Sequence, residues 1–178
     1  MKLINFQTKY LKNAHLFYKE YCHKDNTALL ESAEIVDKSG VQSLIGLSAA
    51  LKVTCDDLKV TVQALNQNGL GLASMLAKSL NTELSKDSFS ITYKRPDKNL
   101  DEATRLKADG PMTVMRKLQE LLKPCEGIFV SGVIAFDFIN NFEYIGDVPK
   151  GKNPCSDYGF YVFDISIRSN HVHKETTV

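Results

Sequence analysis

Apolar and polar residues alternate most regularly between residues 44 and 64 of this 178-residue chain. Over residues 58–64 every second residue is apolar, which is the period of a strand that buries one face. Residues 44–54 have a similar pattern, and Cys-Asp-Asp at 55–57 separates the two segments. Because aspartate favours turn conformations, the pattern predicts a β-hairpin over residues 44–64.

Four other segments have the composition of β-strands. They are residues 27–35, 88–93, 127–138 and 158–169. The third segment is almost wholly apolar and rich in β-branched and aromatic residues, so we expect it to be central in a sheet. The fourth segment alternates well and lies close to the end of the sequence, so we expect the natural polypeptide to continue and to supply a neighbouring strand.

Three segments instead repeat apolar residues at helical spacing. They are residues 9–22, 71–80 and 111–123. Pro111 suits the first turn of the third helix, and Pro124 ends that helix. The polar stretch 97–110 is interpreted as a loop with a turn of helix around residues 101–107.

The interspersed helices and hairpin-linked strands predict an α+β fold, in which an antiparallel β-sheet carries a few packed helices. The composition is 43 % hydrophobic and 24 % charged, which is close to the globular average and excludes a disordered chain. The length suits one domain with a real core. We therefore expect a single domain over residues 1–178.

The charge balance indicates neither a nucleic-acid partner nor a membrane partner. The net charge is +1, and the few arginines are too scattered for a phosphate-binding cluster. No stretch is apolar enough to span a bilayer, and the N-terminal residues are too polar for a signal peptide. The four cysteines are far apart without a C-x-x-C pair, so we interpret them as reduced thiols and expect a cytoplasmic protein.

Three local patterns resemble functional motifs, and each has a simpler interpretation. Residues 68–71 (Asn-Gly-Leu-Gly) have only two glycines of a phosphate-binding loop, and the predicted antiparallel hairpin favours a plain turn. His171 and His173 could form a metal pair, but a frayed tail is favoured. Asp137 and Glu143 could act as acid and base, although such residues more often cap a turn or pair with lysine. We therefore expect no catalytic residue and no metal ligand in this chain.

Several short motifs occur in an order that resembles a known family. They are LLESAEI (29–35), QSLIGLSAALKVTC (42–55), VTVQALNQNG (60–69), LDEATRL (100–106), SGVIAFDFINNFE (131–143) and CSDYGFYVFD (155–164). Their order and spacing resemble the N-terminal part of anthranilate synthase component I over residues 27–168. That family supplies the large subunit of the first enzyme of tryptophan biosynthesis.

In that family the L-L-E-S motif, here residues 29–32, lines an allosteric site for L-tryptophan. The resemblance therefore implies that Leu30, Glu31 and Ser32 contact this ligand. Glu31 can oppose the ammonium group, Ser32 can hydrogen-bond the ligand, and apolar neighbours can enclose the indole. Relatives have a basic residue near the position of Gln42, so electrostatic contact with the ligand carboxylate is not expected from that position.

The resemblance also implies an activity for the whole enzyme, which makes anthranilate and pyruvate from chorismate and glutamine-derived ammonia. Its partners are a glutamine amidotransferase subunit (component II) and a C-terminal chorismate-binding domain of the same polypeptide, which holds Mg²⁺. None of the motifs of that domain occurs here, so we expect a regulatory domain that is inactive alone and has no cofactor. Two alternatives stay open: component I of aminodeoxychorismate synthase, from the folate pathway, and an interaction module without a small-molecule ligand.

Overall fold

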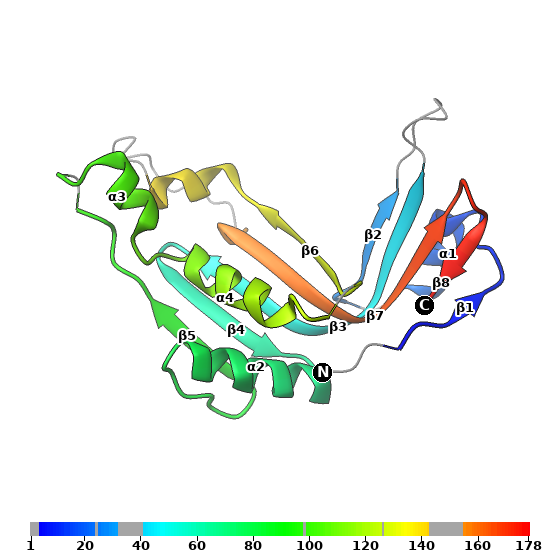
Figure 1. The fold of residues 1–178 in the computed structure, drawn as a ribbon, viewed down its shortest axis with the longest axis horizontal. Coiled ribbons are helices and arrows are strands. Elements are labelled where there is room, and N and C mark those ends of the chain that lie inside the picture. Colours follow the sequence, from blue (N-terminus) through cyan, green and yellow to red (C-terminus); the bar gives the residue numbers. More distant parts are fainter. Residues whose placement is uncertain (1–3, 24, 32–40, 98, 126, 143–154) are drawn as a thin grey trace.

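Two long antiparallel strands, β3 (Gln42–Asp56) and β7 (Tyr158–Asn170), form the centre of the fold in the computed structural model. Their register shifts between Gly46 and Leu51. Bulges of this kind bend a strand pair, and both ribbons curve strongly in Figure 1. The structure describes residues 4–23, 25–31, 41–97, 99–125, 127–142 and 155–178.

The bend divides the sheet into two halves because different strands pair with β3 and β7 on either side of it. One half has the order β6-β7-β3-β4-β5, and the other has the order β1-β8-β7-β3-β2, with every pair antiparallel. The outer strands are β1 (Gln7–Thr8), β2 (Ala28–Glu31), β4 (Lys59–Ala64), β5 (Ser88–Thr92), β6 (Phe129–Ile134) and β8 (Glu175–Thr177). This antiparallel sheet with a few helices confirms the predicted α+β fold.

Helices α2 (Gln67–Ser79) and α4 (Met112–Leu122) pack on the half that contains β4 and β5, as Figure 1 shows. Leu76 of α2 and Leu118 of α4 are buried against strand residues such as Val62. Both helices therefore bury the apolar stripe that their sequence pattern predicts.

Helix α1 (Ala14–Tyr21) packs on the other half, where Ala14 and Ile45 lie at the centre of a smaller core. The chain also forms α3 (Glu102–Lys107) and a 3-10 helix, η1 (Phe136–Asn141), that follows β6. Within the described ranges, no helix is long and apolar enough to cross a membrane.

The predicted hairpin and the three predicted helices are confirmed with altered boundaries. Strands β3 and β4 form the hairpin, and Asp57 in its turn has a φ of 59°. Helix α2 begins earlier than predicted because the Asn66 side chain accepts a hydrogen bond from the Gly69 amide at 3.0 Å. Helix α1 covers only Ala14–Tyr21 of the predicted range 9–22.

The prediction that residues 127–138 form a central strand is wrong. Among the described strands, β6 pairs only with β7, and the chain then enters η1. Val133 is 72 % exposed and Ile134 is 54 % exposed. An apolar, β-branched composition indicates a strand, but it does not determine whether that strand lies at the centre or at the edge of a sheet.

We expect Gly69→Ala to destabilise the protein and Gly71→Ala, on the same helix, to leave it as stable or more stable. A Cβ atom at Gly69 would lie 1.8 Å from the carbonyl oxygen of Ala50, whereas a Cβ atom at Gly71 has no neighbour within 4 Å. Overpacking of this kind costs about 1–3 kcal/mol, while alanine at an open helical position gains about 1 kcal/mol over glycine. Denaturant unfolding measures both effects, and equal stability of the two variants would contradict the close approach of α2 to β3.

Candidate functional site

Strand β2 ends at Glu31, so two of the three predicted tryptophan contacts are its last two residues. Leu30 is paired with Leu44 of β3, and Glu31 is paired with Ser43. Because successive strand residues point to opposite faces, Leu30 and Glu31 do not share a face. Leu30 is 49 % exposed. The third predicted contact, Ser32, lies outside the described residues together with the rest of the predicted strand.

The Glu31 carboxylate has two polar neighbours. Its Oε1 accepts a hydrogen bond from the Ser43 hydroxyl at 3.3 Å, and its Oε2 lies 3.3 Å from His15 Nδ1 of α1. Ser43 is only 1 % exposed, whereas the side chains of Glu31 and His15 are 23 % and 57 % exposed. Oε1 is therefore bound by a buried hydroxyl, whereas Oε2 lies at the partly exposed side of the carboxylate, where a cationic group could bind it.

His171 lies beside Ser43, and the prediction of a frayed tail around it is wrong. Strand β7 runs to Asn170, and a turn leads into β8, which pairs with both β7 and β1. In the His171 ring, Nε2 lies 2.7 Å from Ser43 Oγ, and Nδ1 lies 2.9 Å from the Tyr10 hydroxyl. His173 is exposed, and the described part of the chain contains no group of three side chains that could hold a metal ion.

Ser43 belongs to a row of buried polar side chains that crosses the sheet. Glu31, Ser43 and Ser169 are neighbours across β2, β3 and β7, and the Ser169 hydroxyl lies 2.9 Å from the Thr176 hydroxyl of β8. Thr176 also accepts a hydrogen bond from the Leu11 amide at 2.8 Å. Sequence reasoning missed this row because only the register of strands from distant parts of the chain brings its members together.

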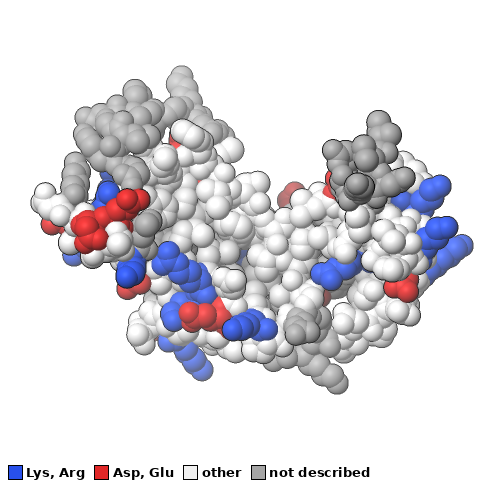
Figure 2. Space-filling view, turned by 45° about the horizontal axis from the view of Figure 1, so that its top comes forward, with Lys and Arg blue, Asp and Glu red and all other residues white. Residues whose placement is uncertain are grey.

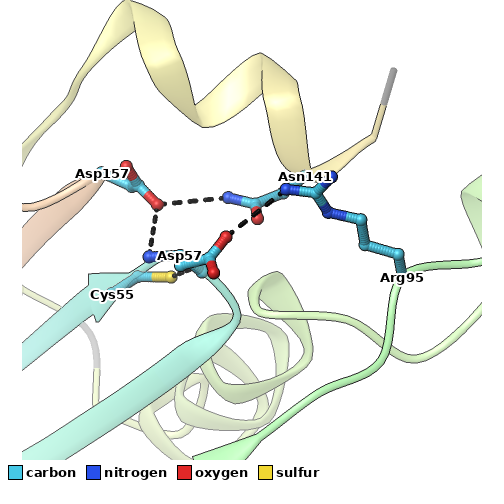
Figure 3. A network of polar contacts seen from close by, with 5 residues as sticks. All are labelled: Cys55, Asp57, Arg95, Asn141 and Asp157. Carbon is cyan, nitrogen blue, oxygen red and sulfur yellow. Dashed lines mark hydrogen bonds and ion pairs between the residues drawn. The ribbon is translucent and has the colours of Figure 1, made fainter. Parts of the chain in front are cut away.

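A second polar network lies at the other end of β3 and is drawn in Figure 3. The Asp157 carboxylate accepts hydrogen bonds from the Asp57 amide at 2.7 Å and from the Asn141 side chain at 3.4 Å, and Arg95 lies 3.5 Å from the Asp57 carboxylate. Burial, with the nearby aspartate charges, raises the pKa of the Cys55 thiol to about 12. The thiol is therefore protonated at neutral pH and is a poor nucleophile. This network fixes the β3–β4 turn against η1.

The glycine-containing loop at residues 68–71 is the first turn of α2 and follows an antiparallel strand. The side chains of Asn66 and Asn68 each donate a hydrogen bond to the Asp164 carboxylate at 2.9 Å. A carboxylate at this position repels a phosphate group. The structure therefore supports the plain turn over the phosphate loop.

Of the two predicted acid–base residues, only Asp137 lies among the residues that the structure describes. Asp137 is exposed in the first turn of η1, and Glu143 lies outside the described residues. Around Asp137 the surface is apolar, because Ile134, Phe136 and Ile139 are all exposed. This surface resembles a docking face more than a catalytic cleft.

An apolar groove of about 540 Å³ lies between α4 and β6. Its lining includes Met112, Met115, Leu118, Leu122, Val130 and Phe160. Neither Leu30 nor Glu31 lines it. In Figure 2, uncharged residues form most of the hollowed surface between the two ends of the molecule. The apolar lining of the α4–β6 groove indicates contact with another protein surface or with a ligand.

No protein-family model matches the chain. Comparison with curated proteins gives relatives that share one name. Anthranilate synthase component 1 from Vibrio cholerae is 30 % identical over 164 residues, which cover 88 % of this chain and 31 % of that protein. The protein of the same name from Haemophilus influenzae is 32 % identical, with 95 % of this chain and 35 % of the relative covered. The Escherichia coli protein is 29 % identical, with 100 % and 36 % covered.

The chain spans about a third of the length of these curated relatives, and almost all of it takes part in the similarity. This coverage is consistent with an N-terminal domain of such a protein. The chain is therefore homologous, over almost its whole length, to a region that makes up about a third of anthranilate synthase component 1.

Proposed function

We propose that this chain is the regulatory domain of an anthranilate synthase component 1 and that it binds L-tryptophan at the end of β2. The observation that carries the proposal is the Glu31 carboxylate, which accepts a hydrogen bond from Ser43 and keeps 23 % of its side chain exposed within the L-L-E-S motif. A carboxylate held in this way can bind the ammonium group of an amino acid through charge-assisted hydrogen bonds. The family resemblance supplies the identity of that amino acid.

The indole ring of the ligand needs apolar surface, which Leu30 offers. Leu30 is half exposed and shares its face of β2 with Ala28, and its partner Leu44 packs in the same cluster as Ala28. Burial of an indole contributes about 4–6 kcal/mol before ordering costs. Because Leu30 and Glu31 point to opposite faces, we place the ligand across the last residues of β2, and the family resemblance assigns Ser32 to the same site.

We also propose that the whole polypeptide makes anthranilate and pyruvate from chorismate and ammonia, with a glutamine amidotransferase subunit as its partner. The chorismate site and its Mg²⁺ ligands then belong to the C-terminal domain, so this chain alone is inactive. Tryptophan inhibits if it binds more tightly to a conformation with a poor chorismate site. A shift of that equilibrium from 1:99 to 99:1 takes about 5.5 kcal/mol of differential binding.

The proposed C-terminal domain docks on the exposed apolar surface of β6, η1 and the α4–β6 groove. This assignment is supported by the exposure of Val133 and Phe136 and by the relatives, which are about three times as long as this chain. The three relatives described above are all anthranilate synthases, which favours anthranilate over aminodeoxychorismate as the product. An interaction module without a ligand would share the apolar surface but would not respond to an amino acid.

L-Tryptophan is expected to raise the thermal unfolding midpoint of the full-length polypeptide, and L-phenylalanine to raise it much less. A ligand that binds only the folded state contributes about 2.7 kcal/mol at a concentration 100 times its Kd. A differential scanning melt with each amino acid measures the effect. If neither amino acid moves the midpoint, the tryptophan site is wrong and the interaction module becomes the better assignment.

The variant Ser32→Phe in the full-length enzyme is expected to relieve inhibition by L-tryptophan, because the larger side chain fills the proposed site. Inhibition is measured as the tryptophan concentration that halves each variant's own rate of anthranilate formation, and we expect it to rise at least tenfold. Ser90→Phe, at an exposed position of β5, is the control and leaves that concentration unchanged. Equal inhibition of the two variants would contradict the placement of the site.

A further inference from the structure

The strands around the proposed tryptophan site contain most of the buried polar side chains of the described residues. Ser43, Ser169 and Thr176 are each at most 2 % exposed, and Asn141 is the only other buried polar side chain in that part of the chain. All three lie in the row that ends at Glu31. Burying polar groups costs free energy that hydrogen bonds only partly offset, so an apolar row would serve the fold alone equally well.

The hydrogen bonds beside this row have a direction. The Ser43 hydroxyl has one proton, which it donates to Glu31 Oε1. At 2.7 Å its oxygen therefore accepts a hydrogen bond from Nε2–H of His171. In the neutral ring Nδ1 is then an acceptor, and the Tyr10 hydroxyl donates to it at 2.9 Å. Tyr10, His171 and Ser43 thus all donate toward the Glu31 carboxylate.

This chain of hydrogen bonds holds only one of the two carboxylate oxygens. Ser43 contacts Oε1, while Oε2 faces His15, whose side chain is 57 % exposed. An ammonium group that approaches from solvent can therefore reach Oε2 by displacing the exposed His15 side chain. The Ser43 side of the carboxylate is fixed by a side chain that is 1 % exposed. A preorganised acceptor loses less conformational entropy when its ligand binds.

We propose that Ser43 and His171 are positioning residues that orient the Glu31 carboxylate for the ammonium group of the bound amino acid. This inference rests on the proposed tryptophan site and assigns a role to two residues outside the L-L-E-S motif. The backbone holds His171 in place for this role, because its amide donates a hydrogen bond at 2.9 Å to the carbonyl of Val41, the residue before β3.

The test compares two ligands by isothermal titration of the full-length polypeptide. L-Tryptophan has the ammonium group, and indole-3-propionate has the same indole without it. Ser43→Ala removes a hydrogen bond to the Glu31 carboxylate and is expected to weaken L-tryptophan binding about five- to tenfold. His171→Phe removes the hydrogen bond between the ring and the Ser43 hydroxyl, and we expect a loss of about the same size because the hydroxyl is then no longer oriented toward the carboxylate. Neither change is expected to alter indole-3-propionate binding by more than about twofold, because that ligand does not use the Glu31 carboxylate.

Three control variants separate positioning from general damage. Ser43→Thr keeps the hydroxyl and is expected to retain L-tryptophan affinity within about twofold. Ser48→Ala removes a hydroxyl from β3 outside the polar row and is expected to change neither ligand. His15→Ala removes the exposed neighbour of Oε2 and is expected to leave L-tryptophan affinity unchanged or raised.

A ligand-free measurement tests the hydrogen bonds themselves. Nitrogen-15 NMR of the histidine rings should show His171 as the Nε2–H tautomer, assigned by the loss of its signals in His171→Phe, and Ser43→Ala should shift them. The opposite tautomer would overturn the inference, and so would equal losses for both ligands. If the unaltered polypeptide binds L-tryptophan and the Ser43 and His171 variants bind it equally well, only the positioning role fails. If it does not bind L-tryptophan, the proposed function fails and the inference with it.

Discussion

The antiparallel pairing of β3 with β7 is the contact around which the other elements are arranged. Each of these strands uses both of its edges, and on the two sides of the bend it pairs with different neighbours. The irregular register between Gly46 and Leu51 produces the bend. The same strand pair therefore contributes to two cores. One is apolar and lies beneath α2 and α4, and the other is smaller, lies beneath α1 and is flanked by buried polar side chains.

The proposed site depends on this arrangement because its parts come from both ends of the chain. Glu31 reaches Ser43 only through the pairing of β2 with β3, and His171 reaches Ser43 only because β7 ends opposite the start of β3. Tyr10 is added by the segment between β1 and α1. A shift of the β3–β7 register by one residue would turn these side chains to the other face, so the bulges that set the register also set the site.

The sequence pattern correctly predicted the elements whose apolar residues repeat at a regular period. The hairpin and helices α2 and α4 have clear periods, and the structure confirms them. The same reasoning placed residues 127–138 at the centre of a sheet, because composition cannot show that β6 pairs with β7 alone among the described strands and leaves Val133 and Ile134 exposed. The family resemblance also assigned Leu30 and Glu31 to one ligand contact, although successive residues of a strand point to opposite faces. The contact between Ser43 and His171 could not be predicted from the sequence, because it depends on the strand register, which no short motif encodes.

A crystal structure of the full-length polypeptide with bound L-tryptophan tests the amino-acid site most directly. We expect the ammonium nitrogen to lie about 2.7–2.9 Å from a Glu31 carboxylate oxygen, with Ser43 still hydrogen-bonded to the other oxygen. We also expect the indole to lie against Leu30 at the end of β2. Tryptophan seated in the α4–β6 groove, or an ammonium group bound away from Glu31, would contradict the account.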